Sequence, residues 1–154
     1  MFYRWAAPVL VLALCAMMPR QAAGQQKSPG HGRGAIGTSY PNPFNPTVTI
    51  PFSVGDEVCG VNEQHVVTVR ILNILAQPVV FPVLLGPAPG STATISTSLN
   101  GQRINNLTLG CGHYQAFWDG HIAATGREAA SGTFAVQVIV DGQLVGTKKI
   151  FHAK

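Results

Sequence analysis

The chain is poor in charge and lacks the signatures of nucleotide-binding sites. Only 10% of its 154 residues are charged, whereas it contains 17 glycines and 11 prolines. It has no Walker loop and no G-x-G-x-x-G fingerprint, which excludes the common phosphate-binding loops. A composition with few charges and many turn formers favours one domain of short strands joined by tight turns over exposed helices.

The basic residues give no sign of a nucleic-acid partner. The net charge is +4, but Arg4 and Arg20 fall within the first 24 residues, which we expect to be removed. The remaining basic side chains are scattered, apart from Lys148 and Lys149, and no aromatic residues are interleaved with them. We therefore expect no binding to nucleic acid.

No apolar run is long enough to span a membrane. The run at 6–18 is interrupted by Pro8 and falls short of the about 20 residues that a membrane helix needs. Arg4 before it and the small residues 22–24 after it are typical of a signal peptide, cleaved after Gly24. A retained N-terminal anchor is the alternative. We expect residues 1–24 to be removed and the protein to reach the periplasm, the outer-membrane surface or the medium, with no transmembrane segment.

The chain has only three cysteines. Cys15 lies in the signal peptide after Leu14, not after the small residue that a lipid-attachment signal needs. Cys59 and Cys111 remain, and an even count in an oxidising compartment predicts one disulfide. The alternatives are two free buried thiols, or a metal pair with the flanking histidines 65 and 113. No C-x-x-C or H-x-x-x-H spacing is present, so we expect no metal and no cofactor.

A proline-rich segment leads into the first strand that we predict. Residues 25–38 are rich in glycine, have no apolar period and predict a flexible linker, so the domain spans 39–154. The stretch SYPNPFNP at 39–46 then holds the residues before its prolines in extended backbone. Apolar residues alternate over 48–53 and predict a strand, in which Pro51 indicates an edge or a bulge. We expect the segment to order this entry and to protect an exposed sheet edge.

The rest of the chain predicts further strands and no helix. About seven strands separated by turn signals indicate an all-β, immunoglobulin-like or fibronectin-like antiparallel β-sandwich, with a small barrel as the alternative. A hairpin through Asp141 and Gly142 joins the last two. The segments after the first strand are 67–72, 78–85, a short strand and loops within 91–106, 114–118, 134–140 and 143–151.

Four motifs occur in an order that resembles a known family. They are YPNPFNP-T-x-I at 40–50, V-x-V-x-I-L-N-I-L-A-Q-P-V at 67–79, Y-x-A-x-W-D-G at 114–120 and T-G-R-x-x-A-S-G-T-F at 125–134. Together they resemble the immunoglobulin-like domain of the flagellar hook-capping protein FlgD and the related C-terminal sorting domains of type IX secretion cargo. The resemblance covers nearly all of 39–154.

The resemblance implies a β-sandwich without catalytic residues, in which the motifs are structural. The motif residues are Tyr40, Pro41, Asn42, Pro43, Phe44, Asn45, Pro46, Trp118, Asp119, Gly120, Ala130, Ser131 and Gly132. In sorting domains a basic tail is read by the export machinery, and the matching segment here is 148–154, with Lys148, Lys149 and Lys154. Ala76 stands where the family often has glycine.

The residues themselves give no convincing catalytic set. Asp119 precedes a glycine at a strand end, which is an ordinary turn choice. His113 and His121 flank the aromatic strand, and Ser131 lacks the G-x-S-x-G context of a hydrolase nucleophile. We therefore expect that the chain is not an enzyme, that no residue is catalytic, and that a small enzyme using Asp119 and His121 is the weakest alternative.

Two functions follow as expectations. The first is an exported immunoglobulin-like module that acts by contact with another protein, in an envelope assembly or at the cell surface. The alternative is a type IX secretion sorting domain, separated from its cargo, that the export machinery reads.

Overall fold

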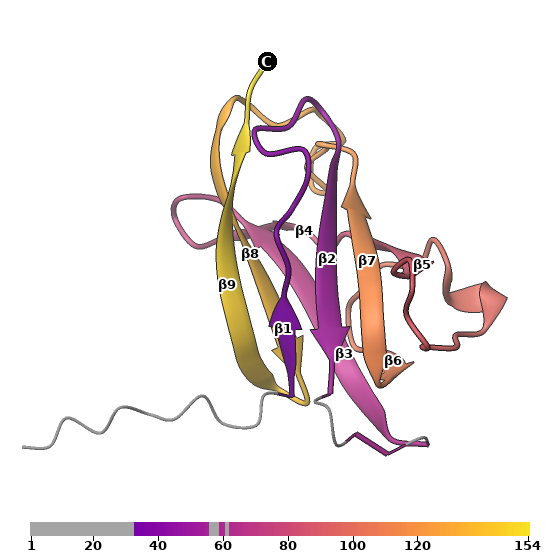
Figure 1. Ribbon diagram of the computed structural model, residues 1–154. Coiled ribbons are helices and arrows are strands. Elements are labelled where there is room, and N and C mark those ends of the chain that lie inside the picture. Colours follow the sequence, from indigo (N-terminus) through magenta and orange to yellow (C-terminus); the bar gives the residue numbers. More distant parts are fainter. Residues whose placement is uncertain (1–32, 56–58, 61) are drawn as a thin grey trace, which may run out of the picture.

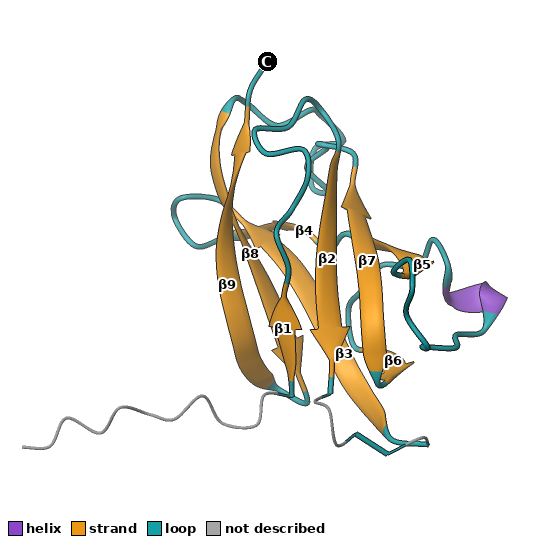
Figure 2. Cartoon of the chain, in the orientation of Figure 1, coloured by secondary structure: helices purple, strands orange, loops and turns teal. Residues whose placement is uncertain are grey.

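The computed structural model describes residues 33–55, 59–60 and 62–154. Nine strands and one short 3-10 helix lie in this part of the chain (Figure 2). They are β1 (Gly34–Ile36), β2 (Val48–Val54), β3 (Gln64–Leu72), β4 (Pro78–Val80), β5 (Val83–Pro87), η1 (Thr97–Leu99), β6 (Leu107–Gly110), β7 (Gly112–Trp118), β8 (Gly132–Val140) and β9 (Gln143–His152). The expected all-β class is confirmed.

The strands form two facing antiparallel sheets (Figure 1). One has the order β1-β2-β7-β5, and the other has the order β4-β3-β8-β9 with β6 beside the first half of β3. Every pairing between named strands is antiparallel. The described part of the chain therefore forms two open layers and not the small barrel that the sequence also allowed.

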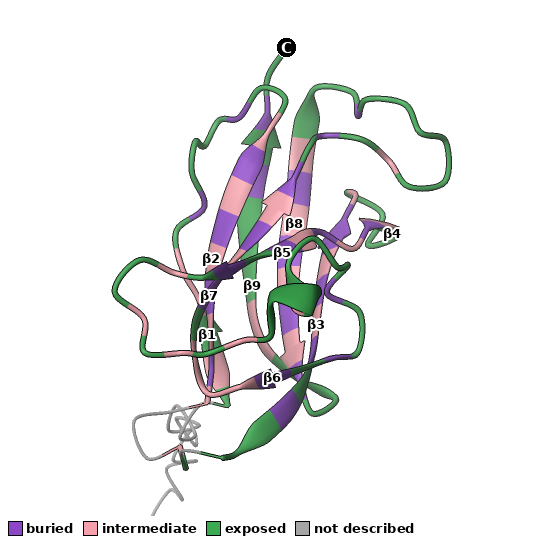
Figure 3. Ribbon diagram, turned by 90° about the vertical axis from the view of Figure 1, so that its right-hand side faces the viewer, coloured by how far each residue is buried: buried purple, intermediate pink, exposed green. Residues whose placement is uncertain are grey.

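The core lies between the sheets because apolar residues alternate along the strands. Buried and half-buried positions alternate through all of β2 and most of β8 (Figure 3). Trp118 packs against Phe44 and Phe134, with ring centroids 5.3 and 5.2 Å apart. This alternation is the period-2 pattern that predicted these strands.

The structure has more strands than the about seven predicted, for local reasons. The segment at 78–85 forms two strands, because the chain leaves β3 after β4, passes Phe81 and Pro82, and joins β7 in the other sheet as β5. No strand lies within 91–106, which contains η1. The strand expected there is β6, which begins at Leu107 and pairs with β3.

The segment predicted as a linker also contains a strand. Residues 34–36 form β1 and pair with Phe52, Ser53 and Val54 of β2. These backbone bonds form without an apolar pattern in β1, so the sequence did not reveal them. The signal peptide predicted at 1–24 and the linker residues 25–32 lie outside the described residues.

Pro51 does not mark an edge strand, because β2 lies between β1 and β7. The Pro51 carbonyl accepts a hydrogen bond from the Gly37 backbone N–H at 2.7 Å, just beyond the end of β1. In an antiparallel strand the N–H and C=O of one residue face the same side. The missing N–H of Pro51 therefore faces β1 and costs no bond with β7.

In the described ranges, no helix has the length and apolar character needed to cross a membrane.

Candidate functional site

The proline-rich motif binds the end of the last strand. The Phe44 backbone N–H donates to the Phe151 carbonyl at 2.8 Å, and the Ala153 N–H donates to the Phe44 carbonyl at 3.0 Å. Asn42 Oδ1 accepts from the Phe151 N–H at 2.9 Å. A segment near the start of the domain thus runs parallel to the end of β9, beside the C-terminus (Figure 1).

The W-D-G motif forms the neighbouring turn at the same end. The Trp118 indole N–H donates to the His121 carbonyl at 2.9 Å, and Asp119 Oδ1 accepts from the His121 backbone N–H at 3.0 Å. Gly120 has a φ of 83°, and a Cβ there would lie 2.5 Å from the Pro46 carbonyl oxygen. The glycine is therefore needed for a left-handed turn against the proline-rich segment.

The A-S-G motif and the C-terminal residues complete this end. Ser131 Oγ accepts from the Lys154 backbone N–H at 3.0 Å. His152 is buried, lies 3.2 Å from the Ala130 carbonyl through Nδ1, and stacks on Phe44 at 4.8 Å. The proline-rich, W-D-G and A-S-G motifs thus lie together in the structure, where their residues form turns and pack against one another.

The predicted sorting tail is part of the fold and not a free extension. Ile150 and His152 are buried, while Lys148 and Lys149 on the same strand are exposed. Lys154 Nζ lies 3.5 Å from Glu128 Oε2. Lys154 therefore has an acidic partner. Lys148 and Lys149 are exposed and have no acidic partner among the residues that the structure describes.

The opposite end of the sandwich carries the disulfide between Cys59 and Cys111. Their Cα atoms are 6.1 Å apart and 52 positions separate them in sequence. Cys59 lies between β2 and β3, and Cys111 lies between β6 and β7. Each connection passes from one sheet to the other, so the bond ties two crossings together. The predicted pairing is present.

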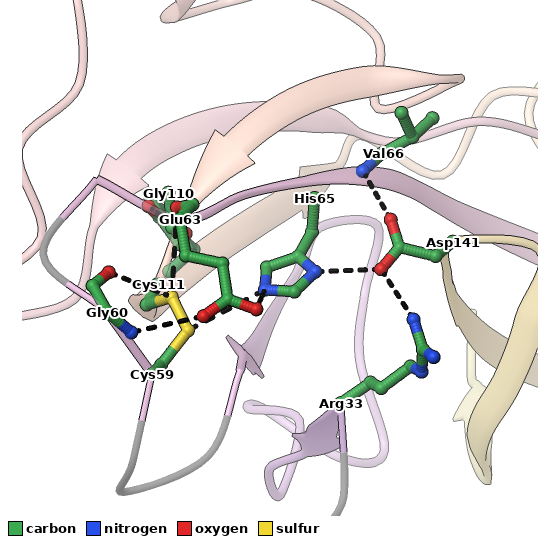
Figure 4. Close-up of polar contacts among 10 residues, drawn as sticks. Arg33, Cys59, Gly60, Glu63, His65, Val66, Gly110, Cys111 and Asp141 are labelled. Carbon is green, nitrogen blue, oxygen red and sulfur yellow. Dashed lines mark hydrogen bonds and ion pairs between the residues drawn. A yellow bond between two sulfur atoms is a disulfide. The ribbon is translucent and has the colours of Figure 1, made fainter.

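A buried histidine beside the disulfide is held by a carboxylate (Figure 4). His65 Nδ1 lies 2.7 Å from Asp141 Oδ2, which also accepts from Arg33 at 2.9 Å. Asp141 Oδ1 accepts from the Val66 backbone N–H at 2.9 Å. The hydrogen bond with His65, then that with Val66, lowers the pKa of Asp141 below its usual value.

The other ring nitrogen of His65 faces the sulfur atoms. His65 Nε2 lies 3.6 Å from Cys59 Sγ and 3.5 Å from Glu63 Oε1 (Figure 4). Glu63 Oε2 accepts from the Gly60 backbone N–H at 3.1 Å. The sulfur atoms, one Glu63 oxygen and one His65 nitrogen all lie within 4.8 Å of one another.

Sequence reasoning found only part of this cluster. It named His65 and the two cysteines, but it treated Asp141 as a turn residue and assigned no role to Arg33 or Glu63. Asp141 and His65 are 76 positions apart, and no local pattern links them. His113, the other histidine considered as a partner of the cysteines, lies exposed on β7.

A cleft of about 240 Å³ lies beside the W-D-G turn. Asp119, His121 and Arg103 border it, together with Val83 and Phe117. His121 Nδ1 lies 3.5 Å from Asp119 Oδ1, and both side chains are about half exposed. Asp119 serves the turn as predicted from the sequence, and no serine, threonine or cysteine lines this cleft within the described chain.

No protein-family model and no curated protein matches the sequence. Among solved structures, the chain is similar to the alkylpurine DNA glycosylase AlkC of Pseudomonas fluorescens bound to DNA containing an abasic site analog. The identity is 15% and the TM-score is 0.45, over 80% of this chain and 31% of that chain. Because that protein is an enzyme, the expectation that this chain is not an enzyme is withdrawn. A likeness this weak assigns no reaction to the chain.

Proposed function

We propose that the chain is an exported immunoglobulin-like module that binds another protein of the bacterial envelope or cell surface through the edge of β9. Two open antiparallel layers support the immunoglobulin-like assignment. The meeting of the proline-rich, W-D-G and A-S-G motifs at one end, described above, supports the resemblance to FlgD and to sorting domains. The observation that carries the proposal is the unpaired backbone along the edge of β9.

Part of β9 presents unpaired backbone to solvent. Phe151 uses its outward N–H and C=O to bind Asn42 and Phe44. Outward and inward groups alternate along an antiparallel strand, so Lys149 and Thr147 also direct their N–H and C=O away from β8. Both residues are exposed, and neither has an outward backbone partner among the residues that the structure describes.

The chemistry of this edge favours an acidic, extended partner segment. Lys148 lies on the same face of β9 as buried Ile150 but is itself exposed. With Lys149 it places two positive charges beside the open backbone, and Phe151 adds a side chain that is 45% exposed. An extended peptide can add to such an edge through main-chain bonds, with nearby side chains giving specificity.

Edge lysines also have a protective explanation, since inward-pointing and edge charges prevent unwanted strand pairing. Partner binding and edge protection predict different results when the charge of the two lysines is reversed. The double substitution Lys148→Glu and Lys149→Glu keeps the edge charged but should abolish binding to an acidic partner segment. Arg127→Glu is the matched control, because Arg127 is exposed and lies outside β9.

The test is site-specific photo-crosslinking in cells from position 147, with Thr125, which lies outside β9, as the control position. We expect one discrete cross-linked envelope protein from position 147, retained with Arg127→Glu and lost in the double lysine variant. The proposal fails if position 147 gives no discrete product, or if position 125 gives the same one.

The exposed lysines near the C-terminus also favour the second function, a sorting domain read by the type IX machinery. Deletion of 148–154 would not test it cleanly, because the deletion removes buried Ile150 and His152 and would unfold the domain. The double lysine variant keeps these residues. A sorting role predicts that this folded variant stays in the periplasm, whereas normal export with loss of the cross-link supports the binding module.

A further inference from the structure

We propose that the disulfide end of the sandwich is also a metal site. When the Cys59–Cys111 bond is reduced, the two thiolates, His65 Nε2 and the Glu63 carboxylate bind one Zn²⁺ ion. This inference is independent of the function proposed above, because it uses residues at the opposite end of the sandwich from the motifs.

The donor set and its spacing suit zinc. Cysteine, histidine and carboxylate are its usual protein ligands, in four-coordinate tetrahedral sites. The four ligand atoms already lie within 4.8 Å of one another. A tetrahedron with bonds of 2.0 to 2.3 Å has edges of about 3.3 to 3.8 Å, so the other atoms need shifts of about 1 Å while the sulfur atoms separate.

The support around His65 is a second and independent observation. A zinc-bound histidine usually directs its other ring nitrogen to a carboxylate or carbonyl, which fixes the tautomer and the ring orientation. His65 Nδ1 lies 2.7 Å from Asp141 Oδ2, and Nε2 points to Cys59 Sγ (Figure 4). Nδ1 donating to Asp141 leaves a lone pair on Nε2, directed at the place where the metal would lie.

The carboxylate that orients His65 is itself fixed. Asp141 accepts hydrogen bonds from Arg33 and from the Val66 backbone N–H. Its backbone N–H donates to the Val66 carbonyl at 2.8 Å, which anchors the β8–β9 turn to β3. The His65 side chain is only 8% exposed. The support for a metal ligand is therefore built into the folded domain.

Glu63 is held in a comparable way. Its Oε2 accepts from the Gly60 backbone N–H at 3.1 Å, which leaves Oε1 on the side of His65 Nε2. The carboxylate is thus oriented toward the cluster in the oxidised protein. Cys59 and Cys111 lie between strands, so their side chains can separate without breaking a ladder.

The conversion of the disulfide-bonded protein into the reduced, zinc-bound protein balances with a dithiol as the reductant. The dithiol gives two electrons and two protons to the Cys59–Cys111 bond and becomes a cyclic disulfide, leaving two protein thiols. Binding of Zn²⁺ then releases both thiol protons to solvent, because the metal ligand is the thiolate. Neutral imidazole and ionised carboxylate bind without further change.

The test compares oxidised and reduced protein with Zn²⁺ and with Co²⁺. A phosphine reductant, which takes oxygen from water to become its oxide, is used without air and then removed. We expect the reduced protein to bind one Zn²⁺ in competition with a chromophoric chelator, and the oxidised protein to bind none. Co²⁺ should give a sulfur-to-cobalt charge-transfer band and the visible bands of a tetrahedral site.

Variants separate this site from two cysteines acting alone. Asp141→Asn should weaken Zn²⁺ binding about 10- to 100-fold, the usual effect of losing a supporting group. His65→Gln and Glu63→Gln remove ligands and should weaken it at least as much. His113→Gln is the matched control, because His113 lies outside the cluster, and its binding should equal that of the unmodified protein.

Folding is followed by thermal unfolding of each reduced protein with and without Zn²⁺. Zn²⁺ should raise the unfolding temperature of the reduced unmodified protein and of His113→Gln, and raise that of His65→Gln much less. The proposal is overturned if reduced protein binds no Zn²⁺ stoichiometrically. It is also overturned if His65→Gln and Glu63→Gln both bind Zn²⁺ as tightly as the unmodified protein, since the cysteines would then suffice.

Discussion

Asp141 joins three parts of the molecule from one turn position. Its φ is 50°, a left-handed conformation that Asp tolerates better than most residues. Its side chain contacts Arg33, His65 and the Val66 backbone. The turn prediction at Asp141 and Gly142 was therefore correct, but the carboxylate has a second task that a turn pattern does not reveal.

We expect the stability that Asp141 contributes to the oxidised, metal-free protein to depend on pH. The folded-state pKa of Asp141 is lowered, chiefly by the hydrogen bond with His65. Its contribution is thus fully present above the unfolded value of about 3.9 and is lost as pH falls through the lower folded value. Asp141→Asn should lower the free energy of unfolding at neutral pH and flatten its dependence on pH in this acid range, as measured by urea unfolding.

The control for this prediction is Asp119→Asn. Asp119 is also a turn residue, but its side chain is 61% exposed. An equal change in the acid dependence for both variants would contradict the role given to Asp141.

Gly120→Ala should be more harmful than Gly126→Ala. Both glycines have positive φ, 83° and 64°, but a Cβ at Gly120 meets the Pro46 carbonyl, whereas a Cβ at Gly126 meets nothing within 4 Å. Gly126→Ala should cost about 1 kcal/mol of backbone strain, and Gly120→Ala should exceed that because the proline-rich segment must also move. Equal unfolding free energies for the two variants would contradict the packing described for the motif.

At the level of the elements, the proline-rich segment at 39–46 holds one end of the sandwich together. The segment at 42–44 binds the end of β9 through three backbone N–H groups, and the Phe44 ring lies between Trp118 and His152. The prolines hold this segment extended, so little order has to be gained when it docks. Entry and exit strands thus stabilise each other.

Phe44→Ala should therefore destabilise the whole domain. The side chain is 1% exposed, and truncation of a buried phenylalanine usually costs about 3 to 5 kcal/mol. Tyr40→Ala, at a residue of the same motif that is 48% exposed, should cost clearly less. Urea unfolding measures both, and comparable losses would show that the ring is not part of the core.

The sequence could predict the elements whose pattern is local. Apolar residues recur at every second position through β2 and most of β8, so their core faces were clear, and the Asp141-Gly142 signal located the last hairpin. β1 and β6 are short, and their pairing depends on backbone partners remote in sequence. The single strand predicted at 78–85 is two strands in the structure, β4 and β5, because its halves join different sheets. The cluster at the disulfide was found only in part, because Arg33 and Asp141 approach His65 through tertiary structure.

At the level of the whole molecule, the disulfide and the motifs secure opposite ends of the sandwich. Loss of the Cys59–Cys111 bond in a Cys59→Ser, Cys111→Ser variant should lower the free energy of unfolding by about 4 kcal/mol for a loop of 52 positions. Reductant without metal should weaken the unmodified protein similarly and leave the double variant unchanged. An unfolding midpoint that does not respond to reductant would contradict the bond.

On the proposed function, the folded domain is itself the exported, working protein. The most direct test is the intact mass of native protein from separated periplasmic, membrane and medium fractions, without reductant. We expect a chain running from Gln25 to Lys154, lighter by the two hydrogens that disulfide formation removes. A mass that lacks the C-terminal region would contradict it, because β9, which closes the fold and carries the proposed binding edge, would then have been removed.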